Sequence, residues 1–315
     1  MDAAAEKVTA PSGTQWTIDR AGHRAVVVEV GGGLRAYGVD GVDVLDGYAE
    51  SELCPGAAGQ ILAPWPNRIR DGRYTFDGHG YQLGLTEPSR HNAMHGLVRW
   101  SRWRTAANDD GAGDGAITVE HELVPQPGYP WPLLLRTTWT VGPDGLTGEH
   151  SATNLGDRPA PFGLAAHPYL RLPGVAVDDM HLRVPAHSRL LSDARLLPIG
   201  AARVAGGDYD YTEGRRIGAA VLDLAFGDLE RDGDGISTVT LAGPDGRELR
   251  VWADEAFGWW QVFTSDTQPA PRQRRSVAVE PMTCPPDAFR SGRDVVSLEP
   301  GETWRGRWGI SPRLS

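Results

Sequence analysis

The sequence LLLRTTWTV at residues 133–141, followed by the turn GPDG at residues 142–145, decides the fold class of this chain. Apolar and polar side chains alternate along it, with Leu135 and Trp139 on one side and Arg136 on the other. A period of two residues is that of a β-strand with one buried face. The glycine, proline and aspartate that follow predict a tight turn into a second, antiparallel strand.

The same pattern recurs along the chain. Short runs rich in β-branched and aromatic residues predict further strands at residues 25–30, 237–241, 249–252, 260–264 and 276–280. The GPDG turn recurs at residues 243–246, and Asp77-Gly78 is another hairpin signal. Helical patterns are scarce and short. Many strands with glycine and proline turns predict an all-β sandwich or barrel rather than alternating strands and helices.

Length and composition favour one domain over residues 1–315. A chain of 315 residues could form one large domain or two small ones, but it contains no low-complexity linker or long repeat. The clearest loop, residues 108–115, lies between predicted strands rather than between domains. We therefore expect a single β-sandwich domain.

Charge and cysteine content narrow the class of protein. The net charge of -10 argues against a nucleic-acid partner, because phosphates require lysine and arginine. No stretch approaches the roughly 18 apolar residues of a membrane span, and residues 1–7 lack the apolar core of a signal peptide. Only Cys54 and Cys284 occur, which is no disulfide framework. These features predict a cytoplasmic protein without membrane contact.

Four polar residues stand in apolar or turn-rich surroundings far apart in the sequence. They are Arg68, His95, His167 and Glu280. A carboxylate and a histidine can exchange protons with a substrate, and an arginine can hold its oxygens. Together they indicate proton transfer on a neutral polyhydroxy substrate, provided that the fold brings them together.

The local sequence around two of these residues supports such a role. Glu280 ends an apolar run and should point with Ala278, opposite Val279, while Pro281 should break the strand ladder. His167 precedes a proline, which favours an extended backbone at the end of a strand. The alternatives are a rim glutamate paired with arginine and a buried structural histidine.

Other chemistries find less support in the sequence. His91 and His95 would share one face of a helix, as zinc ligands do, but Pro88 and Gly96 indicate a loop. We therefore expect no metal site. The alternative to zinc ligands is a pair of loop histidines that are hydrogen-bonded to the backbone. Residues 31–38 are glycine-rich but lack the Gly-Lys-Ser/Thr of a phosphate-binding loop, and no Gly-x-Ser-x-Gly is present.

Several segments, in this order along the chain, resemble the aldose 1-epimerase (galactose mutarotase-like) family. They span residues 16–311 and comprise APWPNRI at 63–69, MHGL at 94–97, GLAAHPY at 163–169, VEPMT at 279–283 and LEPGE at 298–302. The resemblance implies a large antiparallel β-sandwich with few short helices. It also implies a sugar site on the concave face and no cofactor.

The resemblance assigns a role to each candidate residue. Glu280 corresponds to the general base, His167 to the general acid, and His95 to a second histidine near the ring oxygen. Arg68, with Asn67 beside it, corresponds to the group that holds sugar hydroxyls, and Asp223 is the best match for a substrate-binding aspartate. The implied reaction interconverts the α and β anomers of a free aldose by opening and reclosing the ring.

Three alternatives remain open at this stage. A hexose-6-phosphate 1-epimerase would need a cluster of cations, which two groups could supply: Arg99, Arg102 and Arg104, or Arg272, Arg274 and Arg275. A non-catalytic sugar-binding protein would share the fold, and a glycoside hydrolase or lyase would need a second acid near Glu280. We expect a small aldose as the partner, and a monomer or homodimer.

Overall fold

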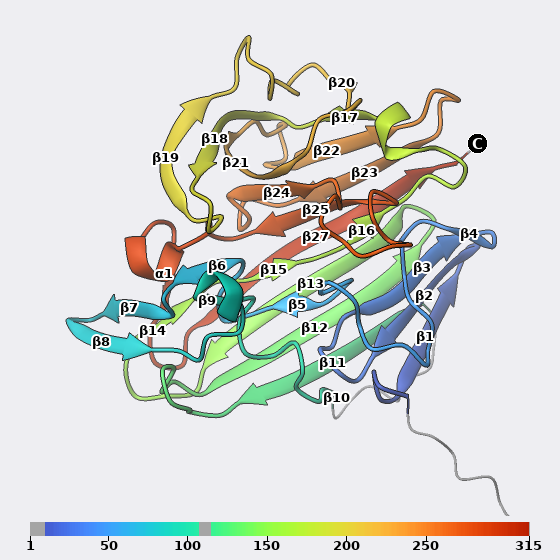
Figure 1. The fold of residues 1–315 in the computed structure, drawn as a ribbon. Coiled ribbons are helices and arrows are strands. Elements are labelled where there is room, and N and C mark those ends of the chain that lie inside the picture. The colour runs from blue at the N-terminus through green and yellow to red at the C-terminus, as the bar shows by residue number, and fades with distance from the viewer. Residues whose placement is uncertain (1–9, 107–114, 315) are drawn as a thin grey trace, which may run out of the picture.

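The computed structural model describes residues 10–106 and 115–314, and antiparallel strands dominate it (Figure 1). Strands make up 47% and helices 3%, which confirms the all-β class. The expected loop at 108–115 lies, except for its last residue, outside the described residues. Within the described part, no helix is long and apolar enough to cross a membrane.

The largest sheet carries the alternating strand at residues 133–141. In spatial order, its nine described strands are β10 (Arg104–Thr105), β11 (Ala116–Leu123), β12 (Leu133–Gly142), β13 (Gly145–Asn154), β27 (Thr303–Arg313), β23 (Glu248–Ala253), β22 (Ser237–Ala242), β17 (His181–Arg183) and β20 (Arg215–Arg216). All their pairings are antiparallel. The long β27, near the C-terminus, lies at the centre of the sheet between β13 and β23.

A second sheet of eight described strands carries three of the six candidate residues, His167, Asp223 and Glu280. In order, the strands are β19 (Pro198–Arg203), β18 (Ala186–Ser192), β21 (Asp223–Leu229), β24 (Trp259–Phe263), β25 (Val277–Met282), β15 (Ala165–Ala166) and β5 (Ile61–Leu62), with β16 (Tyr169–Leu170) also on β25.

Smaller elements surround these sheets. A four-stranded sheet comprises β1 (Gln15–Arg20), β2 (His23–Val28), β3 (Leu34–Val39) and β4 (Val42–Asp43). Three two-stranded ladders comprise β14 (Ala160–Phe162) with β26 (Val296–Leu298), β6 (Arg68–Arg70) with β9 (Asn92–Met94), and β7 (Arg73–Phe76) with β8 (His79–Gln82). The helices are the 3-10 turns η1 (Pro88–Arg90) and η2 (Val177–Asp179) and the single turn α1 (Ala288–Ser291).

The sheets bury one shared apolar core, as the alternating pattern predicts. Along β12, Leu135 and Trp139 are buried while Arg136 is exposed. Trp139 lies in one cluster with Ile18 of β1 and Val279 of β25, so all three larger sheets contribute to it. Burial of these apolar faces is the main force that holds the layers together. The architecture is the expected β-sandwich, and the single domain remains a prediction.

Two predicted hairpin turns are confirmed in detail. Gly142 pairs with Gly145, so two residues connect β12 to β13. Phe76 pairs with His79, and the residues between them have φ of 47° at Asp77 and 74° at Gly78. Two consecutive positive φ angles define the tight turn that Asp-Gly favours.

The prediction that Pro281 breaks the strand ladder is wrong. β25 continues through it to Met282, which pairs with both Trp259 and Ala165. The amide of Val279 donates to the carbonyl of Pro168, on the side where β15 and β16 separate. Position 281 faces the same side, because amide directions alternate along a strand. The missing N–H of Pro281 therefore falls on the side of β15, where the register sets Ala166 opposite it, and the ladder with β24 on the other side is kept.

Candidate active site

The strand register places His167 opposite Glu280. Ala165 of β15 pairs with Met282, and Tyr169 of β16 pairs with Ala278, so position 167 lies level with position 280 between them. The histidine Nε2 is 3.4 Å from Oε1 of Glu280. Although 113 positions separate them in the sequence (280 − 167), the sheet makes them direct neighbours.

Two strands on the other side of Glu280 bring Asp223 to the same face. Gln261 of β24 pairs with Glu280, and it pairs on its other edge with Ala225 of β21. Asp223 lies two residues before Ala225 and so shares its face. Gln261 Nε2 donates to Oδ1 of Asp223 over 2.6 Å, which fixes that carboxyl beside the glutamate.

The short β6–β9 ladder supplies Asn67, Arg68 and His95 from another direction. Arg68 pairs with Met94, and just beyond this pair the amide of His95 donates to the carbonyl of Asn67 over 2.8 Å. His95 has a φ of 62° and is followed by Gly96 at 70°. A Cβ at position 96 would lie 2.0 Å from the carbonyl oxygen of Ala63, so glycine is required for the close turn that holds His95.

All six residues proposed from the sequence line one cavity of about 340 Å³. This volume is at the small end of ligand pockets, which range from about 300 to 1,000 Å³. The six are Asn67, Arg68, His95, His167, Asp223 and Glu280. The structure thus brings together residues from five separate segments, while their individual roles stay predictions.

Burial sets the protonation of the central pair. It raises the pKa of Glu280 well above its usual range, an effect that the neighbouring Asp223 reinforces and Arg68 opposes. Burial also lowers the pKa of His167 to about 3, with the positive charge of Arg99 acting in the same direction. Both shifts disfavour the charged forms. They favour a protonated carboxyl next to a neutral imidazole.

Buried polar atoms in the cavity lack protein partners. Within the described residues, Oε2 of Glu280 and Nδ1 of His95 have no hydrogen-bond partner. Leaving a buried donor or acceptor unpaired costs about 1–3 kcal/mol. A ligand rich in hydroxyl groups offers both donors and acceptors to such atoms, which is the chemistry expected of a sugar.

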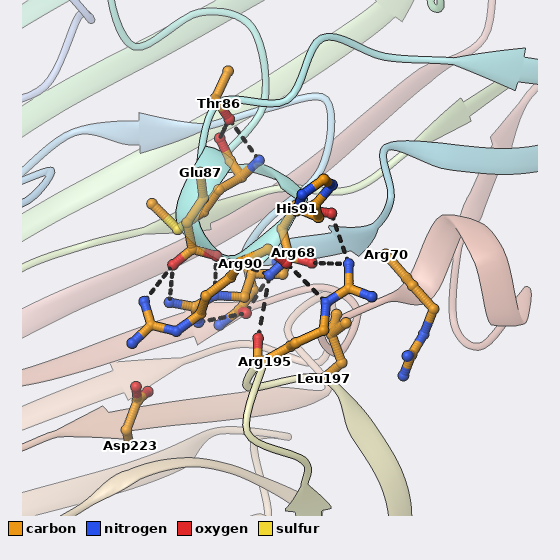
Figure 2. Close-up of polar contacts among 12 residues, drawn as sticks. Arg68, Arg70, Thr86, Glu87, Arg90, His91, Arg195, Leu197 and Asp223 are labelled. Atoms are coloured by element: carbon orange, nitrogen blue, oxygen red, sulfur yellow. Dashed lines mark hydrogen bonds and ion pairs between the residues drawn. The ribbon is translucent and has the colours of Figure 1, made fainter.

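Arg68 is held by a carboxylate that sequence reasoning missed (Figure 2). Glu87 accepts from Nε of Arg68 at 2.9 Å and from Nη2 at 3.1 Å, and it also pairs with Arg90 at 2.9 Å. Burial opposes ionisation of Glu87, but the hydrogen bonds from Arg68 and other donors outweigh it and lower its pKa. Arg195 donates to the carbonyl of Arg90 and so fixes this segment. No motif in the sequence marks Glu87.

A second missed residue is Tyr169, although it belongs to the same motif as His167. Its ring stacks on that histidine with centroids 4.8 Å apart and planes 22° apart. Its hydroxyl donates to the carbonyl of Gly56 and accepts from Gln268. Tyr169 thereby fixes the plane of the imidazole, and its position two residues after His167 was a signal that sequence reasoning could have used.

Two residues close in sequence to Arg68 and His95 lie away from the cavity. His91 is exposed at the end of η1, and Arg70 pairs with Asp193 and Asp287 instead of lining the cavity beside Arg68. Over residues 10–106 and 115–314, no group of three or more histidine, cysteine or acidic side chains is placed to hold a metal ion. The second acid that a glycoside hydrolase would need is present, because Asp223 shares the cavity with Glu280.

The predicted phosphate clusters are not assembled at the site. Of the six arginines named for them, Arg99 alone lines the cavity. Arg102 and Arg104 are exposed and pair with Glu29 and Glu120. The other three pair with acidic side chains elsewhere: Arg272 and Arg275 with Asp46, and Arg274 with Asp178 and Asp266.

A comparison with family models identifies the family of this chain. The model described as Aldose 1-epimerase matches residues 14–311. The chain belongs to the aldose 1-epimerase family. The matched range agrees with the core of residues 16–311 that the sequence motifs predicted.

Relatives in this family differ in how closely they match. The chain is 30% identical over 295 residues to Uncharacterized protein YihR of Escherichia coli (strain K12), covering 93% of this chain and 92% of that protein. It is 28% identical to the galactose mutarotase of Rattus norvegicus over 182 residues, which is 55% of this chain and 50% of that protein.

Solved structures share the fold of this family member. The GalM/aldose epimerase homologue from C. elegans aligns with a TM-score of 0.82 at 18% identity, covering 95% of this chain and 98% of that one. A putative aldose 1-epimerase from Escherichia coli K12 aligns with a TM-score of 0.80 at 20% identity, covering 95% and 99%. At these identities the likeness concerns the fold.

Proposed function

We propose that this protein is an aldose 1-epimerase that interconverts the α and β anomers of a free aldose. The observation that carries the proposal is the contact of 3.4 Å between His167 Nε2 and Glu280 Oε1 inside the cavity. Two groups that share one proton can take a proton from one sugar oxygen while giving one to another. In a cyclic aldose the anomeric hydroxyl can give up a proton, and the adjacent ring oxygen can accept one.

The reaction uses the pair in both directions. Glu280 as a carboxylate takes the proton of the C1 hydroxyl, while His167 as imidazolium protonates the ring oxygen, and the C1–ring oxygen bond breaks. This step leaves a neutral carboxyl and a neutral imidazole beside the open aldehyde. Rotation about C1–C2 and ring closure with the roles reversed give the other anomer.

The directions of the pKa shifts of Glu280 and His167 match the open-chain stage of this reaction. Burial favours a protonated Glu280 and a neutral His167, which is the state that accompanies the open-chain sugar. Transfer of the proton between Oε1 and Nε2 converts this state into the one that opens the ring. A dry, preorganised pair thus stabilises the intermediate rather than the closed ring.

The remaining cavity residues have binding roles in this proposal. Arg68, Asn67, His95 and Asp223 hold the other hydroxyl groups, so that the open chain recloses instead of leaving. Arg68 is suited to this because Glu87 fixes its guanidinium from behind. We also propose a cytoplasmic location, and the oligomeric state remains a monomer or homodimer.

Polarimetry tests the proposal directly. Freshly dissolved α-glucose, α-galactose and other aldoses should lose their initial rotation much faster with the protein than in buffer, and Glu280→Gln protein is the matched blank. Faster mutarotation with wild type alone supports an epimerase. Tight sugar binding without acceleration would instead identify a non-catalytic sugar-binding protein, and acceleration confined to glucose 6-phosphate would identify a phosphosugar epimerase.

A further inference from the structure

Arg99 lines the cavity on a segment whose backbone is firmly held. Its carbonyl accepts a hydrogen bond of 2.8 Å from the side chain of Gln60. Its guanidinium lies 5.6 Å from the centre of the Trp100 ring, which is 51% exposed at the edge of the same cavity. The side chain is therefore presented to a ligand from a fixed position.

This arginine differs from the other two in the cavity by having no acidic partner. Arg68 and Arg90 both pair with Glu87. For the guanidinium of Arg99, the described part of the chain provides neither an ion pair nor a hydrogen bond. Burial lowers the pKa of Arg99, which shows that its charge is poorly solvated. An anionic group on the ligand would compensate that charge.

Arg99 acts at the histidine end of the cavity. After burial, its charge is among the causes that lower the pKa values of His95 and His167. The cation that acts on Glu280 is Arg68, not Arg99. The backbone places it there as well: Gln60, whose side chain donates to the carbonyl of Arg99, accepts from the amide of His167 through its own carbonyl. His95 lies four residues before Arg99. Arg99 therefore enters the cavity beside the two histidines.

This position corresponds to one side of a bound sugar ring. The ring oxygen of an aldopyranose is bonded to C1 and to C5, and C5 carries the exocyclic carbon. With Glu280 at the C1 hydroxyl and His167 at the ring oxygen, a cation beyond the histidines faces C5 and its substituent. We propose that the preferred substrate is an aldose with a single negative charge on this exocyclic carbon, bound by Arg99.

The proposal rests on the proposed function for the orientation of the ring, and it specifies a monoanion rather than a phosphate. A phosphate monoester carries about −1.5 to −2 charges at neutral pH and is usually met by several cations. Among the described residues, Arg99 is the one arginine of the cavity without a carboxylate. A carboxylate or sulfonate group matches one guanidinium in charge.

The experiment compares three sugars and three proteins. The sugars are glucose, glucuronate with its planar acid group, and glucose with a sulfonate at C6 as a tetrahedral monoanion. The proteins are wild type, Arg99→Gln, and Arg102→Gln as a matched control. Arg102 lies three residues after Arg99 and pairs at the surface with Glu29, so Arg102→Gln removes the same charge outside the cavity.

The expected result is a preference that Arg99→Gln abolishes. Wild type should convert at least one acid sugar with kcat/KM about tenfold to hundredfold above that of glucose, as one charge-assisted contact supplies. Arg99→Gln should lose this ratio, which is taken within each protein so that the effect of Arg99 on the histidines cancels. Arg102→Gln should keep both the ratio and the rate with glucose. The relative rates of the two acid sugars identify the acid group. Equal rates with all three sugars, or a preference that survives Arg99→Gln, would overturn the proposal.

Binding separates this proposal from the proposed function. A methyl glycoside cannot open its ring, so calorimetric titration with methyl glucuronide and methyl glucoside measures recognition without catalysis. Tighter binding of the glucuronide that depends on Arg99 supports the anion site even if no sugar is epimerised. Equal binding of both glycosides contradicts it even if glucose is epimerised rapidly.

Discussion

Two buried histidines, one in each of the two large sheets, have pKa values lowered by burial but differ in their hydrogen-bond partners. Burial lowers the pKa of both His150 and His167 to about 3. His150, on β13, contacts the hydroxyl of Thr137 through Nδ1 and accepts from Trp308 through Nε2, both at 2.8 Å. His167 instead has Nε2 beside Glu280 at 3.4 Å, and it faces a cavity.

The difference lies in what satisfies the ring. Both nitrogens of His150 are occupied by the protein, so a ligand has nothing to bind. The residues around His167 leave polar atoms such as Oε2 of Glu280 unpaired. A perturbed pKa and deep burial are therefore shared by structural and candidate catalytic histidines, and hydrogen-bond satisfaction distinguishes them.

The largest expected effect is on turnover at the cavity. Glu280→Gln should lower kcat by about two to four orders of magnitude, as removal of a positioned proton-transfer group does. His167→Asn should behave alike, and the double variant should be little worse than either, because the groups act as a unit. Polarimetry measures all three, and a single variant that retains over about a tenth of wild-type activity would remove that residue from the proton-transfer pair.

In the nine-stranded sheet, a histidine substitution should lower stability and leave turnover unchanged. His150→Ala should lower the free energy of unfolding by about 2–4 kcal/mol, because it leaves a cavity and unpaired partners, while kcat stays near wild type. His167→Ala should cost less stability, since solvent can enter its cavity. Urea denaturation of both variants measures this. Equal stability losses would show that the two sites are not distinguished by hydrogen-bond satisfaction.

Arg68 should have a smaller effect, on binding more than on chemistry. Lysine cannot make the two-pronged contact with Glu87, so Arg68→Lys should raise KM by about tenfold and lower kcat less. Glu87→Gln should raise KM in the same direction, because it loosens the same guanidinium. Steady-state kinetics with one aldose measure both, and an unchanged KM with a collapsed kcat would assign Arg68 to the developing charge instead.

The smallest expected effect is that of pH on kcat/KM. An ordinary histidine acid would make the rate fall as pH rises through about 6.5. Here burial lowers the pKa of His167 and raises that of Glu280, so the one-proton state of the pair persists on both sides of neutrality. A profile of kcat/KM for a neutral aldose should be flat through pH 6.5, and a clear limb there would contradict the buried, coupled pair.

Much of the fold followed from local patterns in the chain. The alternation at residues 133–141 and the glycine-containing turns predicted the class of fold, because side-chain period and turn geometry are local properties. The effect of Pro281 was mispredicted, because it depends on which of the two neighbouring strands the missing amide faces. The motifs and the family resemblance also yielded six of the residues that line the cavity.

What the sequence determined by itself was the strand pattern and the set of candidate residues. Tertiary structure decided which of them meet: register across β25 placed His167 beside Glu280, and the β6–β9 ladder brought His95 to them. It also decided that Glu87 holds Arg68 and that Arg99 alone, of six arginines considered, faces the cavity. These facts depend on contacts between residues far apart in the chain, which no local pattern encodes.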